Sequence, residues 1–234
     1  MIMREVLVMQ PPRPKAMTQL EAAYRLHRFD QAEDKAAFLT EVGARCEAVV
    51  TNGHTVLNRD QIAQLPNVGI VACSSAGFET IDAEALRENG IALTNSSDVL
   101  ADDVADLALL LTLAARRQLV AAHAYVTSGD WGRQGMYPLL SSIKGKRAGI
   151  VGLGVIGKAI AKRFEPLGLE IGYTARSKKP VDYAYHTDAL SLARWSDILV
   201  VIVPGGEETR GLVSREVIEA VGPTGTIVNA VSYT

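Results

Sequence analysis

Short apolar runs rich in β-branched residues alternate along this chain with segments of helical spacing. The runs that predict buried strands are residues 5–9, 47–52, 68–74, 91–95, 147–152, 169–174, 197–203 and 225–230. Between the early ones, residues 17–26, 34–42 and 82–90 repeat apolar side chains at helical intervals, and the last of these ends on Gly90. Strands that alternate with helices are typical of parallel sheets joined by crossover helices. The sequence therefore predicts an α/β fold.

Residues 96–131 interrupt this alternation of strand and helix patterns, because their helical periodicity of apolar residues continues for much longer than an average helix. We predict one long helix there, from about Leu100 to Thr127, at the joint between two domains. The predicted domains are residues 1–98 and 99–234. Because the helix carries the run "LALLLTLAA", it is more apolar than one domain needs, which favours burial against a second copy and hence a homodimer. The alternative is a helix buried inside the monomer.

The charge balance excludes several kinds of partner. With 24 Lys and Arg against 26 Asp and Glu, the net charge is −2, so we expect neither nucleic acid nor an anionic membrane as a partner. The N-terminal apolar run is too short for a secretory signal, and no run reaches the roughly 20 residues of a membrane-spanning helix. We therefore expect a cytoplasmic protein. Cys46 and Cys73 lack a metal-ligand spacing, so we expect two reduced, buried thiols and no metal site.

A glycine-rich loop follows the strand predicted at 147–152. Gly152, Gly154 and Gly157 form the pattern G-x-G-x-x-G at the head of a helix, which is the context of a dinucleotide-binding loop. Backbone amides at the N-terminus of such a helix can approach a diphosphate. The alternative is a strand-to-helix turn without a ligand. The predicted cofactor-binding residues of the loop are Gly152, Leu153, Gly154, Val155, Ile156 and Gly157.

The end of the next strand indicates which dinucleotide binds. NAD-binding proteins usually place Asp or Glu there, on the ribose hydroxyls, whereas this chain has Arg176, Ser177 and Lys178, followed by Lys179. Guanidinium, hydroxyl and ammonium groups suit a 2′-phosphate better than a 2′-hydroxyl. We therefore predict NADP as the cofactor, with NAD possible. The alternative is a solvated basic turn.

Three stretches together resemble the D-isomer-specific 2-hydroxyacid dehydrogenases. They are "VGLGVIGKAIAKR", "ADDVADLALLLTLAARR" and "SDILVVIVPGGEETRGLVSREVIEAVGPTGTIVN", and residues 51–53 and 71–109 also fit the family pattern. The basic turn is most similar to that of the NADPH-dependent hydroxyphenylpyruvate, glyoxylate and hydroxypyruvate reductases. The resemblance implies a flavodoxin-like substrate domain, a Rossmann-type doubly wound cofactor domain, and reduction of a 2-oxo acid to a 2-hydroxy acid by a hydride.

The resemblance also implies site residues. The backbone amides of Ala76 and Gly77, in "CSSAGF", would bind the substrate carboxylate, and Gly53 would line the same pocket. The alternative for this loop is a plain turn at a strand end. Val104 would lie near the nicotinamide, although a valine on a long helix is otherwise a core residue. Pro204 and Thr209 match the loop that passes along the cofactor.

The chain departs from the family pattern after residue 229. Ser232 stands where the family has its catalytic Arg, and we find no match for the family's Glu and His, so no catalytic residue is assigned. From this we expect a shortened dehydrogenase that lacks the last strands of its cofactor sheet and turns over 2-oxo acids poorly. Two hypotheses stay open. The first is an NADP-dependent 2-oxo acid reductase whose sequence is incomplete or whose missing segment is supplied by another chain, and the second is a silent homologue that only binds dinucleotide or dimerises. The sequence does not specify which 2-oxo acid is the substrate.

Overall fold

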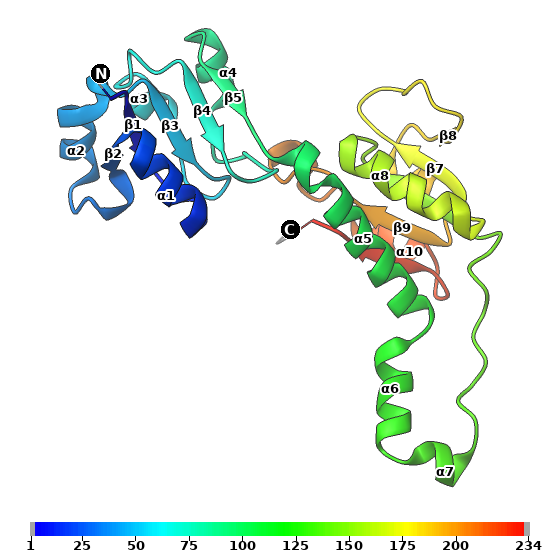
Figure 1. The fold of residues 1–234 in the computed structure, drawn as a ribbon. Helices are drawn as coiled ribbons and strands as arrows, with labels where there is room; N and C mark the ends of the chain where they lie inside the picture. The colour runs from blue at the N-terminus through cyan, green and yellow to red at the C-terminus, as the bar shows by residue number, and fades with distance from the viewer. Residues whose placement is uncertain (1–2, 232–234) are drawn as a thin grey trace. The chain divides into compact units, whose positions relative to one another are not determined.

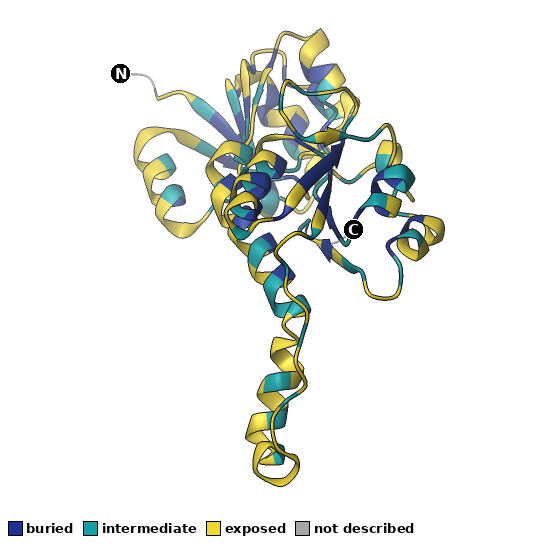
Figure 2. Cartoon of the chain, turned by 90° about the vertical axis from the view of Figure 1, so that its right-hand side faces the viewer, coloured by how far each residue is buried: buried dark blue, intermediate teal, exposed yellow. Residues whose placement is uncertain are grey.

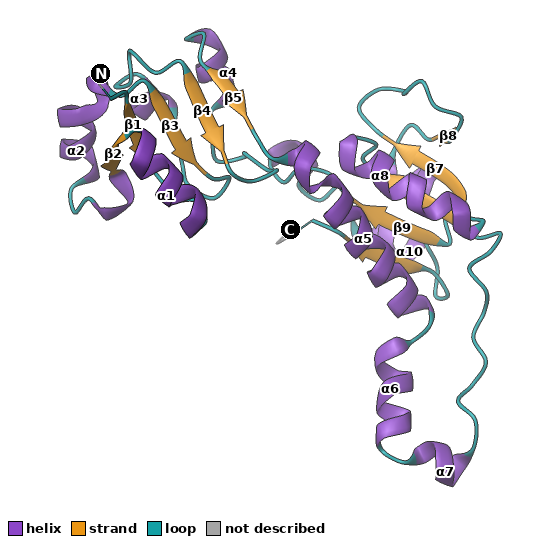
Figure 3. Ribbon diagram, in the orientation of Figure 1, coloured by secondary structure: helices purple, strands orange, loops and turns teal. Residues whose placement is uncertain are grey.

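The computed structural model describes residues 3–231, and it divides into two compact units, Met1–Ser97 and Asp98–Thr234. Each unit is an α/β structure built on its own five-stranded sheet (Figure 1; Figure 3). Every strand pair within the described residues is parallel. The predicted fold class is therefore confirmed.

The first unit has the strand order β2-β1-β3-β4-β5, which is the flavodoxin-like order that the resemblance implied. Its strands are β1 (Glu5–Val8), β2 (Arg25–Arg28), β3 (Ala48–Thr51), β4 (Ile70–Cys73) and β5 (Ala92–Thr94). Its helices are α1 (Pro14–Ala23), α2 (Lys35–Val42), α3 (Arg59–Ile62) and α4 (Ala83–Glu88), with 3-10 turns η1 (Phe29–Gln31) and η2 (Gly43–Arg45).

One face of this sheet is closed and the other is partly open. Leu7, Val49 and Val71 point into a core with residues of α2, α3 and α4, and all three are fully buried. The opposite face carries α1 and leaves hollows of about 460 and 480 Å³ beside that helix. Ile70 is 39% exposed on this sheet.

The second unit has the strand order β10-β9-β6-β7-β8. Its strands are β6 (Arg147–Val151), β7 (Glu170–Thr174), β8 (Ala184–Tyr185), β9 (Ile198–Val201) and β10 (Thr226–Asn229). Its helices are α5 (Ser97–Arg116), which begins at the boundary residue, α6 (Leu119–Thr127), α7 (Asp130–Gln134), α8 (Val155–Phe164), α9 (Ala189–Trp195) and α10 (Arg215–Ala220), with 3-10 turns η3 (Glu165–Leu167) and η4 (Glu207–Thr209).

Helices cover both faces of the second sheet, as in a doubly wound fold. Ile150 packs into a core with α5 and α8, whereas the next residue, Val151, packs into a separate core with α9 and α10. Strand β6 lies between β7 and β9, and both of these side chains are buried. A strand buried on both faces reads as a continuous apolar run, which is why β6 was predictable.

The single long helix predicted from Leu100 to Thr127 is wrong in detail. Helix α5 ends at Arg116, and Gln118 adopts a left-handed conformation with φ of 48° before α6 begins. Helices α6 and α7 then extend away from the sheet of their unit, and Figure 2 shows them mostly in the colours of exposed and intermediate residues. Helix α5 is buried along one face only, by residues such as Ala105 and Ala108, while Leu110 is 56% exposed.

The sequence patterns missed two strands and three helices, namely β2, β8, α3, α7 and α9. The helix predicted at 17–26 ends at Ala23, and its last residues belong instead to β2. This strand reads "RLHR", without β-branched residues, because it lies at the edge of the sheet. Helix α9 begins at Ala189, and the carboxylate of its N-cap residue, Asp188, accepts a hydrogen bond from the Ser191 N–H at 2.7 Å.

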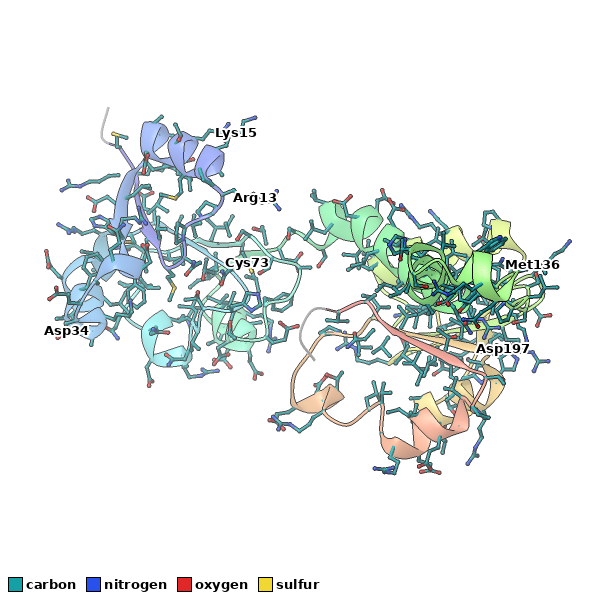
Figure 4. The ribbon with its side chains drawn as sticks, turned by 90° about the horizontal axis from the view of Figure 1, so that it is seen from below. Arg13, Lys15, Asp34, Cys73, Met136 and Asp197 are labelled. Carbon is teal, nitrogen blue, oxygen red and sulfur yellow. The ribbon has the colours of Figure 1, made fainter. Side chains whose placement is uncertain are left out.

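Both cysteines are free and buried. Burial raises the pKa of the Cys46 thiol to about 11, so that side chain stays protonated at neutral pH. Cys73 ends β4 (Figure 4). Among the described residues, no helix is long and apolar enough to cross a membrane.

Candidate functional site

The glycine-rich loop connects β6 to α8, as its pattern predicted. Gly152 has φ of +103°, which only glycine adopts readily, and the helix ladder begins with the Lys158 N–H donating to the Gly154 carbonyl at 3.0 Å. The amides of Val155, Ile156 and Gly157 therefore belong to the first turn, where N–H groups have no partner within the helix. Gly154 is the N-cap and offers no side-chain cap.

The three glycines are held by different neighbours. A Cβ on Gly152 would lie 2.5 Å from the Ile202 carbonyl oxygen, and a Cβ on Gly157 would overlap the Gly152 carbonyl. A Cβ on Gly154, by contrast, would meet no protein atom within 4 Å. The protein's own packing thus requires the first and third glycines, while the space at the second is open. That open space at a helix N-terminus fits the diphosphate of a dinucleotide.

Of the other predicted loop residues, Leu153 is 1% exposed and packs in the core of the unit, while Val155 is 51% exposed. Ile156 is partly buried against the same core as Leu153. Leu153 therefore has only its backbone to offer a ligand.

The basic turn lies beside the glycine-rich loop. Strands β6 and β7 pair with Val151 opposite Thr174, and the Gly152 N–H donates to the Thr174 carbonyl at 2.9 Å. Arg176, Ser177 and Lys178, which follow, are exposed. Within the described residues, no ion pair occupies Arg176 or Lys178. Two unpaired cations thus stand next to the loop that fits a diphosphate.

The loop after β9 is the third segment at this edge, because Val201 pairs with Val151. Thr209 closes the loop by donating from Oγ1 to the Pro204 carbonyl at 2.7 Å. Gly206, between them, has φ of +131°. The structure thus brings the predicted residues Pro204 and Thr209 together. Val104 is partly buried on α5 of the same unit.

In the first unit, two loops meet at the carboxyl ends of β3 and β4. The Gly53 N–H donates to Ser75 Oγ at 2.5 Å, and Ser75 Oγ donates to the Gly77 carbonyl at 3.2 Å. The Ala76 carbonyl accepts from Asn95 Nδ2 at 3.0 Å, immediately after β5. The structure therefore brings Gly53, Ala76 and Gly77 together at this edge of the first sheet.

The amides of this loop differ in their freedom. Among the described residues, no protein acceptor is found for the Ala76 and Gly77 N–H groups, whereas the Gly53 N–H is already used by Ser75. Two free neighbouring amides can bind an anion such as a carboxylate. Sequence reasoning missed Ser75, which joins the two loops, because a serine in a loop gives no distinctive sequence signal.

Two of the four histidines are held by neighbouring side chains, and the other two are exposed. His27 Nε2 lies 2.6 Å from the Glu5 carboxylate, and the His186 ring packs against Trp195, where burial lowers the pKa of His186. His54 and His123 are exposed. Across residues 3–231, no group of three or more His, Cys, Asp or Glu side chains is arranged to hold a metal ion. Ser232, the position predicted to replace the catalytic Arg, lies outside the described residues.

A flavodoxin-like unit with free loop amides, followed by a doubly wound unit with a dinucleotide-binding loop, defines a two-domain nicotinamide dinucleotide oxidoreductase. The family model for the D-isomer specific 2-hydroxyacid dehydrogenase NAD binding domain matches residues 109–231. The chain belongs to the D-isomer specific 2-hydroxyacid dehydrogenase family. It is an NAD(P)-dependent oxidoreductase of the type that reduces a 2-oxo acid to a 2-hydroxy acid.

Individual relatives agree with this assignment. A glyoxylate/hydroxypyruvate reductase A of Arabidopsis thaliana is 42% identical over 225 residues, which cover 96% of this chain and 72% of the relative. A 2-hydroxyacid dehydrogenase structure from Ketogulonicigenium vulgare Y25 is 38% identical with a TM-score of 0.85, covering 98% of this chain and 73% of that one.

A third relative has been solved with ligands. The NADPH-dependent glyoxylate/hydroxypyruvate reductase of Sinorhizobium meliloti, in complex with NADP and malonate, is 31% identical with a TM-score of 0.80. The match covers 97% of this chain and 71% of that one. These comparisons do not favour the alternative of a silent homologue.

Proposed function

We propose that the chain binds NADPH in preference to NADH and acts in the reduction of a small 2-oxo acid of the glyoxylate or hydroxypyruvate kind. The observation that carries the cofactor preference is the basic turn after β7, with Arg176 and Lys178 unpaired beside the open glycine-rich loop. A 2′-phosphate adds two negative charges at that point, and guanidinium groups bind phosphate through charge-assisted hydrogen bonds. The NADP complex of the Sinorhizobium meliloti relative supports the same cofactor.

The loops of the second unit suit binding of the dinucleotide, and the loops of the first unit suit binding of the substrate. In the second unit, the amides of Val155 to Gly157 bind the diphosphate, and Pro204 and Thr209 border the bound dinucleotide. When bound, the reduced nicotinamide supplies the hydride for reduction of the carbonyl. In the first unit, the Ala76 and Gly77 amides bind the substrate carboxylate, and Gly53 lines the pocket. The names of the Arabidopsis and Sinorhizobium relatives support the substrate class.

Titration calorimetry with NADPH and NADH tests the cofactor preference. The unmodified chain should bind NADPH more tightly, and Arg176→Ala should weaken NADPH by about tenfold, at the lower end for a charged hydrogen bond because Arg176 is exposed. Lys162→Ala removes an exposed cation from the far half of α8 and should leave both affinities unchanged. Equal affinities of the unmodified chain for NADPH and NADH would contradict the proposal.

We also propose a homodimer, formed through α5, α6 and α7. The observation that favours it is the exposed apolar surface of these helices, where Leu119 is 54% exposed, Val120 80% and Trp131 51%. Soluble monomers rarely expose contiguous apolar surface of this kind, and a second copy would bury it by two-fold symmetry.

Sedimentation equilibrium measures this directly. The expected species has twice the 25.1 kDa mass of the chain. Val120→Glu should shift the population towards monomer, whereas Ile218→Glu, at a residue 50% exposed on α10, serves as the control. A monomer of the unmodified chain at micromolar concentration would refute the proposed dimer.

A further inference from the structure

Tyr173 is a fully buried tyrosine on β7 whose hydroxyl reaches out of the core to the backbone of Lys179. The hydroxyl accepts the Lys179 N–H at 2.7 Å and donates to the Lys179 carbonyl at 3.3 Å. Its ring packs in the core shared with α8, 5.4 Å from the ring of Tyr185. A buried phenol is stable only when its hydroxyl has a partner, so this core side chain fixes one point of the loop that follows β7.

Lys179, held by the Tyr173 hydroxyl, forms the C-terminal end of the basic turn of Arg176, Ser177 and Lys178. One end of the turn is fixed where β7 ends, since the Thr174 carbonyl accepts the Gly152 N–H. The other end is Lys179, whose carbonyl also accepts the Val181 N–H at 2.9 Å. The Lys179 ammonium donates back across the turn to Ser177 Oγ at 3.2 Å. Arg176 and Lys178 are thus presented from a short loop that is anchored at both ends.

We propose that Tyr173 is a positioning residue for cofactor selectivity: its hydroxyl holds Lys179, and with it the turn of Arg176, Ser177 and Lys178, in the shape that receives a 2′-phosphate. This inference rests on the proposed preference for NADPH. It adds Lys179 to the groups that face the phosphate, because its ammonium is held against Ser177.

The physical reason is preorganisation. A loop that is already ordered loses less conformational entropy when the phosphate binds, so its cations contribute more to affinity. Without the hydroxyl, the same cations remain in the chain, but the turn must be ordered on binding. NADH carries no 2′-phosphate and does not use the turn, so its affinity does not depend on the anchor.

Tyr173→Phe tests the proposal, because it removes only the hydroxyl. Calorimetric titrations use four probes, namely NADPH, NADH, adenosine 2′,5′-bisphosphate and 5′-AMP. One net hydrogen bond corresponds to about threefold to tenfold in affinity. We expect that loss for NADPH and for the bisphosphate, with NADH and 5′-AMP changed by less than about twofold. Tyr185→Phe is the matched control, since it removes a hydroxyl from the adjacent ring, and no hydrogen bond of that hydroxyl is found within the described residues.

A double mutant separates positioning from a general loss of structure. If Tyr173 acts through the basic turn, Tyr173→Phe should have much less effect on NADPH affinity once Arg176 has been replaced by Ala. A selectivity ratio unchanged in Tyr173→Phe, or equal weakening of NADPH and NADH, overturns the inference. A missing preference in the unmodified chain overturns the proposed function instead, so the two failures are distinguishable.

Amide hydrogen exchange on the unmodified, ligand-free chain gives a test that does not depend on the stability of the variant. The Lys179 N–H should be protected, because a buried hydroxyl accepts it, whereas the amides of residues 176–178 should exchange quickly. A Lys179 amide that exchanges as fast as those three would also overturn the inference.

Discussion

Two glycines of the same loop allow ligand binding to be separated from folding. Gly154 has φ of −80° and ψ of −158°, an ordinary conformation for alanine, and a Cβ there would meet no protein atom within 4 Å. Gly154→Ala should therefore leave the fold intact, and reduced entropy of the unfolded chain can add about 0.4 to 1 kcal/mol of stability. If the diphosphate approaches this backbone, the added methyl group occupies its path. We expect NADPH to bind at least about tenfold more weakly, or about 1.4 kcal/mol.

Gly152→Ala should behave in the opposite way. The residue has φ of +103°, and its Cβ would lie 2.5 Å from the Ile202 carbonyl oxygen and 2.9 Å from Val203 Cγ1. A left-handed conformation at a non-glycine residue costs of the order of 1 to 3 kcal/mol, and the close contacts add to that. For a chain of this size, a loss of about 2 kcal/mol lowers the melting temperature by about 4 to 8 °C.

The assay combines calorimetric titration of NADPH with thermal unfolding of the ligand-free protein. The reasoning predicts a Gly154→Ala variant that melts no lower than the parent but binds poorly, and a Gly152→Ala variant that melts lower. If Gly154→Ala binds NADPH as tightly as the parent, the diphosphate does not lie at the N-terminus of α8. If it melts several degrees lower, then the space beside Gly154 is not open in the folded protein.

Two further outcomes concern stability. Asp188→Ala removes the N-cap of α9, where the carboxylate accepts a hydrogen bond from the Ser191 N–H at 2.7 Å. It should lower the free energy of unfolding in urea by about 1 kcal/mol. The control, Asp182→Ala, replaces an exposed acid of the preceding loop and should leave that free energy unchanged. The pKa of Glu5 lies below its usual value of 4.5, chiefly because of the hydrogen bond with His27, so its carboxylate stabilises the fold above that pH and the contribution disappears on acidification. Between pH 6 and pH 3, the free energy of unfolding should fall more steeply with decreasing pH in the parent than in Glu5→Gln. Parallel curves for the two proteins would exclude the Glu5–His27 pair as a source of acid sensitivity.

Much of the fold was predictable because the buried strands appear in the sequence as runs of β-branched residues. Strands β3, β4, β6 and β9 lie inside their sheets, so their sequences are mostly apolar. Edge strands have no such requirement. Three of the four residues of β2 are polar and β8 is only two residues long, so neither produced a pattern that could be distinguished from a helix or a loop.

The break at Gln118 was unpredictable for a related reason. Neither Pro nor Gly interrupts the apolar periodicity between Leu100 and Thr127, and a left-handed glutamine is rare. Helix α5 is also less buried than its composition suggests, because only one of its faces packs against its unit.

For the candidate site, the sequence predicted the segments but not the links between them. The glycine pattern and the basic turn are local signals, so they could be read directly. Ser75, which joins Gly53 to Gly77, and Tyr173, which holds Lys179, act between segments that are 22 and six residues apart. A serine in a loop and a tyrosine in a strand have no distinctive pattern, and their roles depend on side-chain direction in the folded protein.

The all-parallel pairing of both sheets has a consequence for how the chain reaches its native state. Within residues 3–231, no strand pairs with its sequence neighbour through a tight hairpin, since each parallel pair requires a crossover connection. The closest pairs in sequence, such as Gly172 with Ala184, are already 12 residues apart, and Gly149 with Leu199 spans 50. The entropy of closing these loops is lost before the contacts form, so refolding should be slow for the chain's size. During that interval the apolar strands are exposed, and the yield of refolded protein should fall steeply as the protein concentration rises.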